Sequence, residues 1–410
     1  MKKLLLATTA LGLFAAGAAS AAGPVVTVGG FADFQVGSGS QEDAFQNQSS
    51  AGVQNGAETS IYARELHTRT DTNVHFKVDA KADNGLGYGA YIELNADTSA
   101  NDTESADNAA RRTYLYVESG FGRVEAGSTG DAGNALKVDA STFARATGGI
   151  AGDFYKYVDL AGAGSAAFAI LPGLPTAAGL PGEANVGYPG STLAGDTHAD
   201  RANANKVSYY TPRIQGLQAG LSFTPDQDER GTAAGFAGAS DNGSFINVWN
   251  GGLNYQGQFD ALTLNAAATG ETGEAKDNGT VSSLNDDLQA YNLGLSVGFA
   301  GFTVGGSWTD APEIGGVSAD DVSLQAYTLG GAYEFGPFGA SLTYYNSTVE
   351  NGTVAGTDAE FQNISVGADY KLAPGLMPYV EVSFFDTDDN TAGTSDNSGT
   401  VFIVGTQLTF

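Results

Sequence analysis

The sequence predicts an all-β fold: a single transmembrane antiparallel β-barrel of about sixteen strands. Three observations predict it. Apolar and polar residues alternate at period two over stretches of roughly ten residues, which is the length of a tilted membrane-crossing strand. Short turns alternate along the chain with long acidic loops. Beyond the N-terminal segment, no stretch reaches the roughly 18 continuous apolar residues that a transmembrane helix requires.

The first 21 residues have the features of a cleaved signal peptide. Lys2 and Lys3 precede the apolar stretch Leu4–Ala19, and Ala19-Ser20-Ala21 supplies the small residues that a signal peptidase needs. The mature chain, 22–410, shows the same strand pattern throughout and no interdomain linker. We therefore expect one barrel domain in a chain that has been exported from the cytoplasm.

The composition is strongly acidic and excludes nucleic acid as a partner. Without the two lysines of the signal segment, 16 basic residues face 46 acidic ones, a balance that cannot provide the basic surface that nucleic acids need. The acidic residues concentrate in Gly/Asn/Ser/Thr-rich stretches, which we interpret as solvated loops: Asp97–Asp107, Thr224–Arg230, Glu271–Asp287 and Asp386–Asp396. Cysteine is absent, so stability must come from backbone hydrogen bonds and packing.

The clearest strand pair lies between Leu288 and Thr309. Alternate residues from Tyr291 to Phe299 are mostly large and apolar, while the intervening residues are Asn, Ser and Gly. A minimal turn at Ala300-Gly301 leads into a second alternating stretch. The same reasoning predicts sixteen strands over the following ranges: 25–36, 72–83, 86–97, 111–119, 122–129, 205–211, 217–224, 246–256, 260–269, 288–299, 302–309, 323–335, 338–348, 361–372, 378–386 and 400–410.

Turn lengths indicate how the strands are connected. Tight turns are predicted at Asn84-Gly85, Ser119-Gly120, Gly257–Phe259, Ala300-Gly301 and Gly336-Pro337. Long acidic loops join the other strand ends. An even strand number allows an antiparallel sheet to close, so that no edge leaves unpaired backbone groups in hydrocarbon.

Three segments carry a family resemblance. The C-terminal strand places Phe402, Leu408 and the terminal Phe410 on one face, which is similar to the assembly signal of outer-membrane barrels. The other two are the segments Arg112–Gly127 (RTYLYVESGFGRVEAG) and Arg201–Gly216. The latter contains Asn-x-Val-x-Tyr-x-x-Pro from Asn205 to Pro212 and ends at the pair Gly216-Leu217. Together with the opening strand Val28–Phe34, they resemble the Gram-negative general porins of alphaproteobacterial type.

This resemblance implies a trimeric, sixteen-stranded channel in the Gram-negative outer membrane, through which small hydrophilic solutes and ions diffuse passively. Its turns would be periplasmic and its long acidic loops extracellular. The third extracellular loop, 129–204, would fold into the lumen and narrow it. A Gly/Ala/Pro-rich insert at Leu160–Pro189 makes this loop longer than is usual in the family. The implied partners are outer-membrane lipid, lipopolysaccharide and two further copies of the chain.

Strand alternation also predicts which charged residues line the lumen, because a charge on the lipid face costs roughly 2–4 kcal/mol at the midplane. The predicted basic cluster consists of His67, Arg69, Lys77, Lys81 and Arg112. Opposite it, the third loop offers Asp131, Asp139, Asp153 and Asp159. Our hypothesis is that the two groups impose a transverse field that orients dipolar solutes. In the alternative interpretation, the basic residues are ordinary lumen charges paired with Asp79, Glu93 and Glu118.

The sequence offers little support for an enzyme or a calcium-binding repeat protein. An outer-membrane enzyme has little support, because the only histidines are His67, His75 and His198, none accompanies a Gly-x-Ser-x-Gly motif, and no catalytic residue or metal site is expected. A secreted calcium-binding repeat protein should show tandem Gly-Gly-x-Gly-x-Asp motifs, which are not found. No cofactor is expected; calcium could bind acidic loops, but no site can be located. A substrate-specific channel for a sugar, phosphate or another anion stays open as the alternative.

Overall fold

The computed structural model describes residues 23–42, 66–97, 110–158, 160, 171–175, 203–227, 229, 231, 245–275, 287–314, 322–351, 358–389 and 396–410. The predicted signal peptide lies outside these described residues. Within them, no helix is long and apolar enough to cross a membrane.

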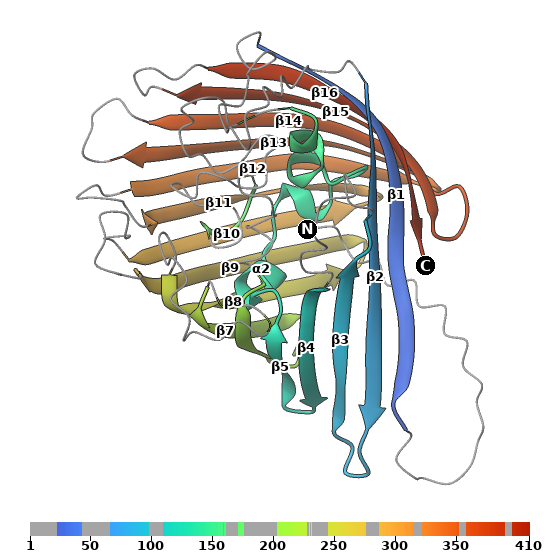
Figure 1. The fold of residues 1–410 in the computed structure, drawn as a ribbon, viewed down its shortest axis with the longest axis vertical. Coiled ribbons are helices and arrows are strands. Elements are labelled where there is room, and N and C mark those ends of the chain that lie inside the picture. The colour runs from blue at the N-terminus through green and yellow to red at the C-terminus, as the bar shows by residue number, and fades with distance from the viewer. Residues whose placement is uncertain are drawn as a thin grey trace, which may run out of the picture.

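Sixteen antiparallel strands form one closed barrel in chain order, as predicted (Figure 1). Their bounds are β1 (Val25–Gln41), β2 (His67–Lys81), β3 (Gly87–Asn95), β4 (Ala110–Ser119), β5 (Gly122–Ser128), β6 (Asn205–Tyr210), β7 (Leu217–Asp226), β8 (Phe245–Phe259), β9 (Leu262–Ala275), β10 (Leu288–Phe299), β11 (Phe302–Ile314), β12 (Val322–Phe335), β13 (Phe338–Asn351), β14 (Ala359–Tyr370), β15 (Leu376–Asp389) and β16 (Asn397–Thr409).

The first and last strands close the barrel. β1 pairs with β16 from Phe31 opposite Thr409 to Gln41 opposite Gly399. The chain terminus takes part, since Gly30 and Phe410 exchange two backbone hydrogen bonds of 2.9 and 3.1 Å. Closure gives every strand two neighbours, which is the condition for placing a β-sheet in hydrocarbon.

The two faces of the barrel differ in polarity as alternation predicts. On β10, Leu293, Leu295 and Val297 are exposed on the outer face, while Asn292 and Ser296 are buried on the inner face. On β12 to β16 large apolar residues also point outward, while the inner face carries Ser, Thr and Asn together with buried apolar residues such as Phe361 and Ile403. The outer surface is therefore a lipid-facing band, and the inner wall combines polar side chains with an apolar patch.

Most strands extend further than predicted, because their polar ends continue to pair beyond the apolar band that alternation detects. β2 begins at His67 and β9 ends at Ala275, five and six residues beyond the predicted bounds. One predicted turn is wrong. Gly257 to Phe259 belong to β8 and pair with β9, and the turn lies at Asp260-Ala261, where Asp260 takes a φ of 53°.

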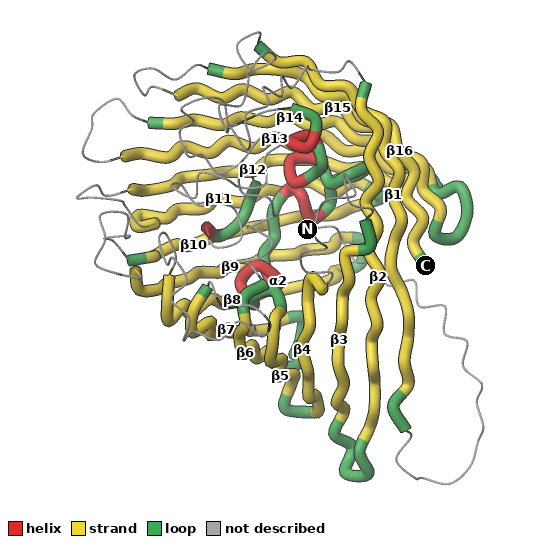
Figure 2. The backbone as a smooth tube through the Cα atoms, viewed as in Figure 1, coloured by secondary structure: helices red, strands yellow, loops and turns green. Residues whose placement is uncertain are grey.

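The segment after β5 turns into the barrel. We call its described residues 129–158 the inner loop; they contain the helix α2 (Ala132–Leu136) and three 3-10 turns, η1 (Ala140–Thr142), η2 (Gly149–Ala151) and η3 (Phe154–Lys156). Figures 1 and 2 show these helical turns within the ring of strands. The inner loop is thus the element that shapes the lumen.

Candidate functional site in the barrel lumen

The inner loop follows the inner wall from β7 round to β1. Seven backbone N–H groups of the loop donate hydrogen bonds to side chains of the wall. At the start of the loop, Ala132 donates to Ser222 on β7 (2.8 Å) and Gly133 donates to Asn250 on β8 (2.5 Å). Further along, Ala140 donates to Thr328 on β12 (3.1 Å), Arg145 and Ile150 donate to Ser341 and Thr343 on β13 (2.8 and 3.2 Å), and Thr147 and Gly149 both donate to Glu381 on β15 (3.2 Å each). Buried backbone donors need partners, and here wall side chains supply them.

Apolar packing secures the same attachment. Ile150 and Phe154 of the inner loop are fully buried in a cluster with residues of β12 to β16, and the rings of Phe154 and Phe361 stack at 6.1 Å. Wall glycines make room at the closest approaches. A Cβ on Gly330 would lie 3.0 Å from that of Ala140, for example. The wall from β7 to β16 is therefore covered, and the wall from β2 to β6 faces the remaining space.

The predicted acidic residues hold the inner loop instead of lining open water. Asp131 caps α2 by accepting from the Asn134 N–H at 2.7 Å. Asp139 is 0% exposed and caps η1, with Lys137 at 2.8 Å. The prediction that Asp139 lines the lumen is therefore wrong, because its buried carboxylate caps η1 and forms an ion pair within the loop. Asp159 lies outside the described residues.

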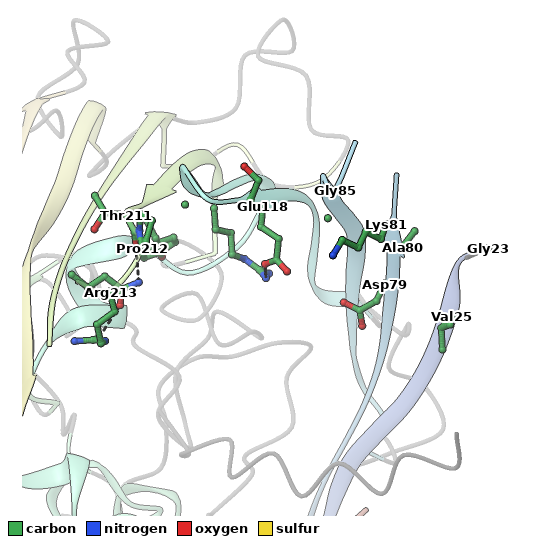
Figure 3. A pocket seen from close by; sticks show the side chains of 16 residues that line it. Gly23, Val25, Asp79, Ala80, Lys81, Gly85, Glu118, Thr211, Pro212 and Arg213 are labelled. Carbon is green, nitrogen blue, oxygen red and sulfur yellow. Dashed lines mark hydrogen bonds and ion pairs between the residues drawn. The ribbon is translucent and has the colours of Figure 1, made fainter. Parts of the chain in front are cut away.

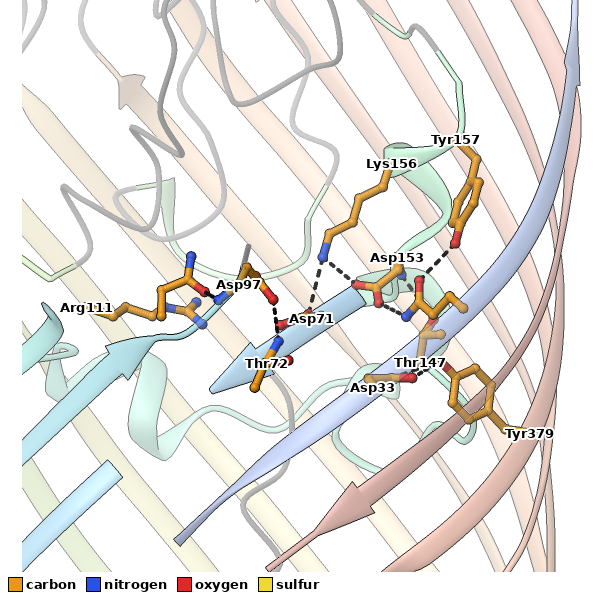
Figure 4. A network of polar contacts seen from close by, with 12 residues as sticks. Asp33, Asp71, Thr72, Asp97, Arg111, Thr147, Asp153, Lys156, Tyr157 and Tyr379 are labelled. Carbon is orange, nitrogen blue, oxygen red and sulfur yellow. Dashed lines mark hydrogen bonds and ion pairs between the residues drawn. The ribbon is translucent and has the colours of Figure 1, made fainter. Parts of the chain in front are cut away.

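Asp153 joins the inner loop to β1. It accepts from the Gln35 amide at 2.5 Å and pairs with Lys156 at 3.2 Å, and Lys156 also reaches Asp71 on β2 at 3.5 Å (Figure 4). The Tyr157 hydroxyl donates to the Gln35 side-chain amide oxygen, Oε1, at 3.0 Å. Asp153 is itself buried, so it acts as an anchor between loop and wall.

Charges within the inner loop are fixed by these contacts. Burial opposes ionisation of Asp139, but the Lys137 ammonium and the Ser141 hydrogen bond outweigh it and lower its pKa. Burial likewise disfavours the charged form of Lys156, yet Asp153 and Asp71 raise its pKa above the ordinary value. Burial and Asp153 raise the pKa of the Tyr157 hydroxyl to about 12. The loop therefore keeps its ion pairs throughout the neutral range.

The predicted basic residues lie on the uncovered wall. A β-bulge at Glu93 places both Arg111 and Arg112 beside its carboxylate, each at 3.9 Å, and Arg112 Nε donates to Asn203 at 2.9 Å. Strict alternation would have sent Arg111 outward. The bulge instead brings a second guanidinium to the inner face.

The remaining basic residues are spread along β2. His67 meets the Tyr157 ring edge-on at 6.4 Å. Arg69 stands opposite Gln35 in the register, which places it on the inner face beside the inner loop. Lys77 pairs with Asp79 at 3.0 Å, as the alternative interpretation expects, and Lys81 is exposed at the short-turn end of β2. The five predicted basic residues thus form a line along one wall and not a compact cluster.

Three further polar residues were missed. Arg123 lies over the Tyr116 ring at 3.9 Å and pairs with Glu118 and Glu125 at 3.0 and 2.7 Å. Lys206 on β6 is buried and donates to the Thr129 carbonyl at the start of the inner loop, at 2.7 Å. Glu381, on β15, is described above. Alternation could have identified Glu381 as inward-facing, since it lies between the apolar residues Val380 and Val382. Arg123 follows Gly122 and Lys206 follows Asn205, so for these two residues the alternation signal is weaker.

Comparison with known proteins agrees with this architecture. The sequence profile of the Gram-negative porin family matches residues 7–390. The chain belongs to the Gram-negative porin family. This porin is 26% identical to an uncharacterised protein of Rickettsia bellii over the full length of both chains, and 26% identical to one of Rickettsia typhi, covering 83% of this chain and 84% of that protein.

Solved structures share the fold. An anion-selective porin from Comamonas acidovorans superimposes with a TM-score of 0.56 at 16% identity, covering 94% of this chain and all of that one. The trimer form of OmpT, an outer membrane protein of Vibrio cholerae, gives a TM-score of 0.54 at 13% identity, with 94% and 99% coverage. The porin is therefore an outer-membrane channel, and family and fold favour a channel over an enzyme.

The three residues predicted to form the C-terminal assembly signal lie on one face of the last strand and its end. Phe402, Leu408 and Phe410 are all exposed on the outer face of the barrel. Their role in assembly stays a prediction. Among the described residues, no group of three or more His, Asp or Glu side chains is arranged to hold a metal ion.

Proposed function

We propose that the porin is a general-diffusion channel for small hydrophilic solutes and ions. One observation carries the proposal: on the uncovered wall, side chains that point into the barrel are open to solvent. Lys77, Asp79 and Glu118 are 37%, 42% and 47% exposed, although they belong to the inner face. Charged groups stay solvated only where water reaches them, so this wall borders an aqueous path.

Selectivity would arise from the charge difference across that path. Arg69, Arg111 and Arg112 lie on the uncovered wall. In the inner loop, Asp139 and Asp153 form ion pairs with Lys137 and Lys156, and Asp131 caps α2. Solutes would pass between a basic wall and a polar loop surface, in a low-dielectric surround that strengthens the field. The overall charge of −28 attracts cations to the molecule, so opposing local and global fields would give weak net ion selectivity.

A specific channel for a phosphate-like or other anion is the second candidate. It is favoured by the gathering of basic side chains on one wall of an acidic chain, and the structurally similar porin of Comamonas acidovorans is described as anion-selective. The two candidates differ in whether a solute binds during passage.

We also propose a homotrimer in contact with outer-membrane lipid and lipopolysaccharide. The structurally similar Vibrio cholerae protein has a trimer form. The outer face of β1 combines exposed Val26 and Val28 with the small residues Gly30 and Ala32, and such small residues allow close approach of a neighbouring subunit.

Single-channel recording in planar bilayers tests the function. We expect large conductance steps that close in threes and reversal potentials that show weak ion selectivity under a salt gradient. We expect no block of the current by sugars or phosphate between the inner loop and the uncovered wall. Solute-dependent block that Arg69→Ala or Arg112→Ala removes would establish the specific channel instead. Absence of conductance from folded, heat-modifiable protein would refute both.

A further inference from the structure

The inner wall carries a second apolar cluster, separate from the one around Phe154. Four of its members face inward from β10, β12 and β13 and are each no more than 5% exposed: Leu288, Ala290, Leu324 and Val349. They pack with further buried residues of β8 and β11, which are Phe245, Val248, Ala311 and Ile314. We call these residues the rim cluster, because they lie near the strand ends that adjoin the long loops.

The rim cluster lies further along the strands than the inner-loop contacts. Leu324 precedes Thr328, which accepts from the Ala140 N–H, by four residues. Leu288 precedes Gly294, where the wall approaches the inner-loop backbone, by six residues. At about 3.4 Å per residue, these offsets correspond to roughly 14–20 Å along a strand. The cluster therefore belongs to the next level of the lumen, on the long-loop side of the inner loop.

A short segment from outside the strands packs on this cluster. Leu174 is the one described residue from outside the wall strands among the buried members of the cluster, and it is 1% exposed. Its neighbours Pro172, Gly173 and Pro175 are buried as well. We call Leu171–Pro175 the strap. Apolar side chains are unfavourable where they face water, so the strap accounts for apolar residues on the inner face of a channel.

Contacts on two sides fix the strap. The Tyr345 hydroxyl on β13 donates to the Leu171 carbonyl oxygen at 3.2 Å. The Lys137 ammonium of the inner loop donates to the Pro172 carbonyl oxygen at 2.6 Å. Helix α2 also lies against the strap, since a Cβ on Gly133 would be 2.8 Å from Cδ1 of Leu174. The strap is therefore held between the wall and the inner loop.

Open space lies on the opposite wall. A pocket of about 660 Å³ is formed there, at the short-turn end, by the ends of β2 and β4, the start of β5 and the β6–β7 turn (Figure 3). Its lining includes Asp79 and Glu118 of the uncovered wall. The inner loop and the strap thus fill one side of the lumen at two successive levels, while the other side is left to solvent.

We infer that the strap is a second narrowing of the diffusion path, on the long-loop side of the inner loop, and that Leu174 fixes it there. In outer-membrane barrels the long loops face outside, so an entering solute would meet the strap before the inner loop. The largest solute admitted would then be set at the strap as well as at the inner loop. This inference rests on the proposed diffusion function, because a narrowing restricts solute size only in a conducting channel.

Thiol accessibility tests the attachment of the strap. The chain contains no cysteine, so Ala290→Cys places a single thiol in the rim cluster, at a residue that is 0% exposed. Its reaction with a charged methanethiosulfonate reagent is followed in detergent-solubilised porin. We expect Leu174→Asp to speed this reaction about tenfold or more, since a carboxylate is poorly accommodated among apolar side chains, and Leu174→Ala to speed it less. Leu66→Asp is the matched control, because Leu66 is an exposed leucine just before β2, at the same end of the barrel.

Liposome swelling tests the narrowing itself, with arabinose and raffinose as neutral probes of different size. We expect Leu174→Asp to raise the ratio of raffinose flux to arabinose flux severalfold, Leu174→Ala to raise it less, and Leu66→Asp to leave it unchanged. Heat-modifiability must match the parent for each variant. If Leu174→Asp does not assemble, the result for Leu174→Ala decides.

Faster labelling together with a higher flux ratio supports the inference. Parent-like labelling in the Leu174 variants overturns it, and so does faster labelling at an unchanged flux ratio, which would mean that the strap lies outside the diffusion path. Arabinose flux in the parent reports on the proposed function separately. Its absence refutes the diffusion function and the narrowing with it, whereas normal arabinose flux with an unchanged ratio refutes the narrowing alone.

Discussion

Glu381 offers the sharpest test of how the inner loop is held. Its carboxylate is fully buried on β15 and accepts three bonds from the loop: two from the backbone N–H groups of Thr147 and Gly149, both at 3.2 Å, and one from the Thr147 hydroxyl at 2.6 Å. The Thr147 hydroxyl in turn accepts from the Asp153 N–H at 3.0 Å. One wall side chain thus organises a complete turn of the loop.

The change Glu381→Ala removes the acceptor and leaves two buried backbone donors unsatisfied. Each such donor costs about 1–3 kcal/mol, so we expect the attached state of residues 147–149 to lose roughly 3 kcal/mol or more, which is a factor of about 100 in the opening equilibrium. The strand ladder is untouched, because Glu381 contributes to the barrel through its backbone alone. The barrel should stay closed while the loop detaches more often.

Hydrogen exchange measures this detachment directly. Amides of 147–157 should exchange about 100-fold faster in Glu381→Ala, and single-channel records should show added flicker at unchanged heat-modifiability. Asp388→Ala is the matched control, since Asp388 is an exposed carboxylate on the same strand. Parent-like exchange in Glu381→Ala would refute this reasoning and show that the apolar cluster around Phe154 holds the loop by itself.

Further predictions concern selectivity, acid stability, packing and assembly. Arg112→Ala should shift the reversal potential toward cations, and an unchanged potential would remove Arg112 from the selectivity argument. The fold lowers the pKa of Asp139, so the Asp139 carboxylate stabilises the loop at pH values above its unfolded pKa of about 3.9, and this stabilisation is lost as the pH falls through the folded value. Hydrogen exchange near η1 should therefore become faster below pH 4. Asp139→Asn should show the faster exchange already at pH 7. Gly294→Val places a side chain against the inner-loop backbone and should alter conductance, whereas Gly331→Val on the open outer face should not. Deletion of Phe410 should lower the yield of heat-modifiable porin in the outer membrane several-fold, and a normal yield would contradict an assembly role.

Much of the fold could be predicted because lipid imposes a strict rule on sequence. Every crossing strand must present apolar residues outward and pair all its backbone groups, so alternation and turn spacing suffice to count sixteen strands. The ends of the strands were harder to predict from the sequence. His67 begins β2 although the stretch His67–Asp71 is polar on both faces, and polarity alone does not separate a paired strand end from a loop.

The lumen was predicted less well, because its geometry depends on contacts between distant parts of the chain. Composition placed acidic residues in the third loop, but not the partners that neutralise them, such as Lys137 for Asp139. The bulge opposite Glu93 shifts by one residue which side chains of β4 face the lumen, and no residue type in that stretch indicates a bulge. The buried acceptor Glu381 could have been noticed as a lone carboxylate between Val380 and Val382, but its loop partners could not.

The distribution of basic residues now has a physical explanation. Strands β8 to β16 contain no Lys or Arg, and all strand-borne basic residues lie on β2 and β4 to β6. The inner loop covers the wall from β7 to β16, where a long basic side chain would have to be desolvated beneath it. Polar Ser, Thr and Asn side chains serve there as short acceptors for loop amides. Apart from Lys206, which is buried against the Thr129 carbonyl at the start of the inner loop, the basic side chains of the strands lie on the wall that water reaches. The position of the loop and the position of these basic residues are therefore two consequences of one packing arrangement.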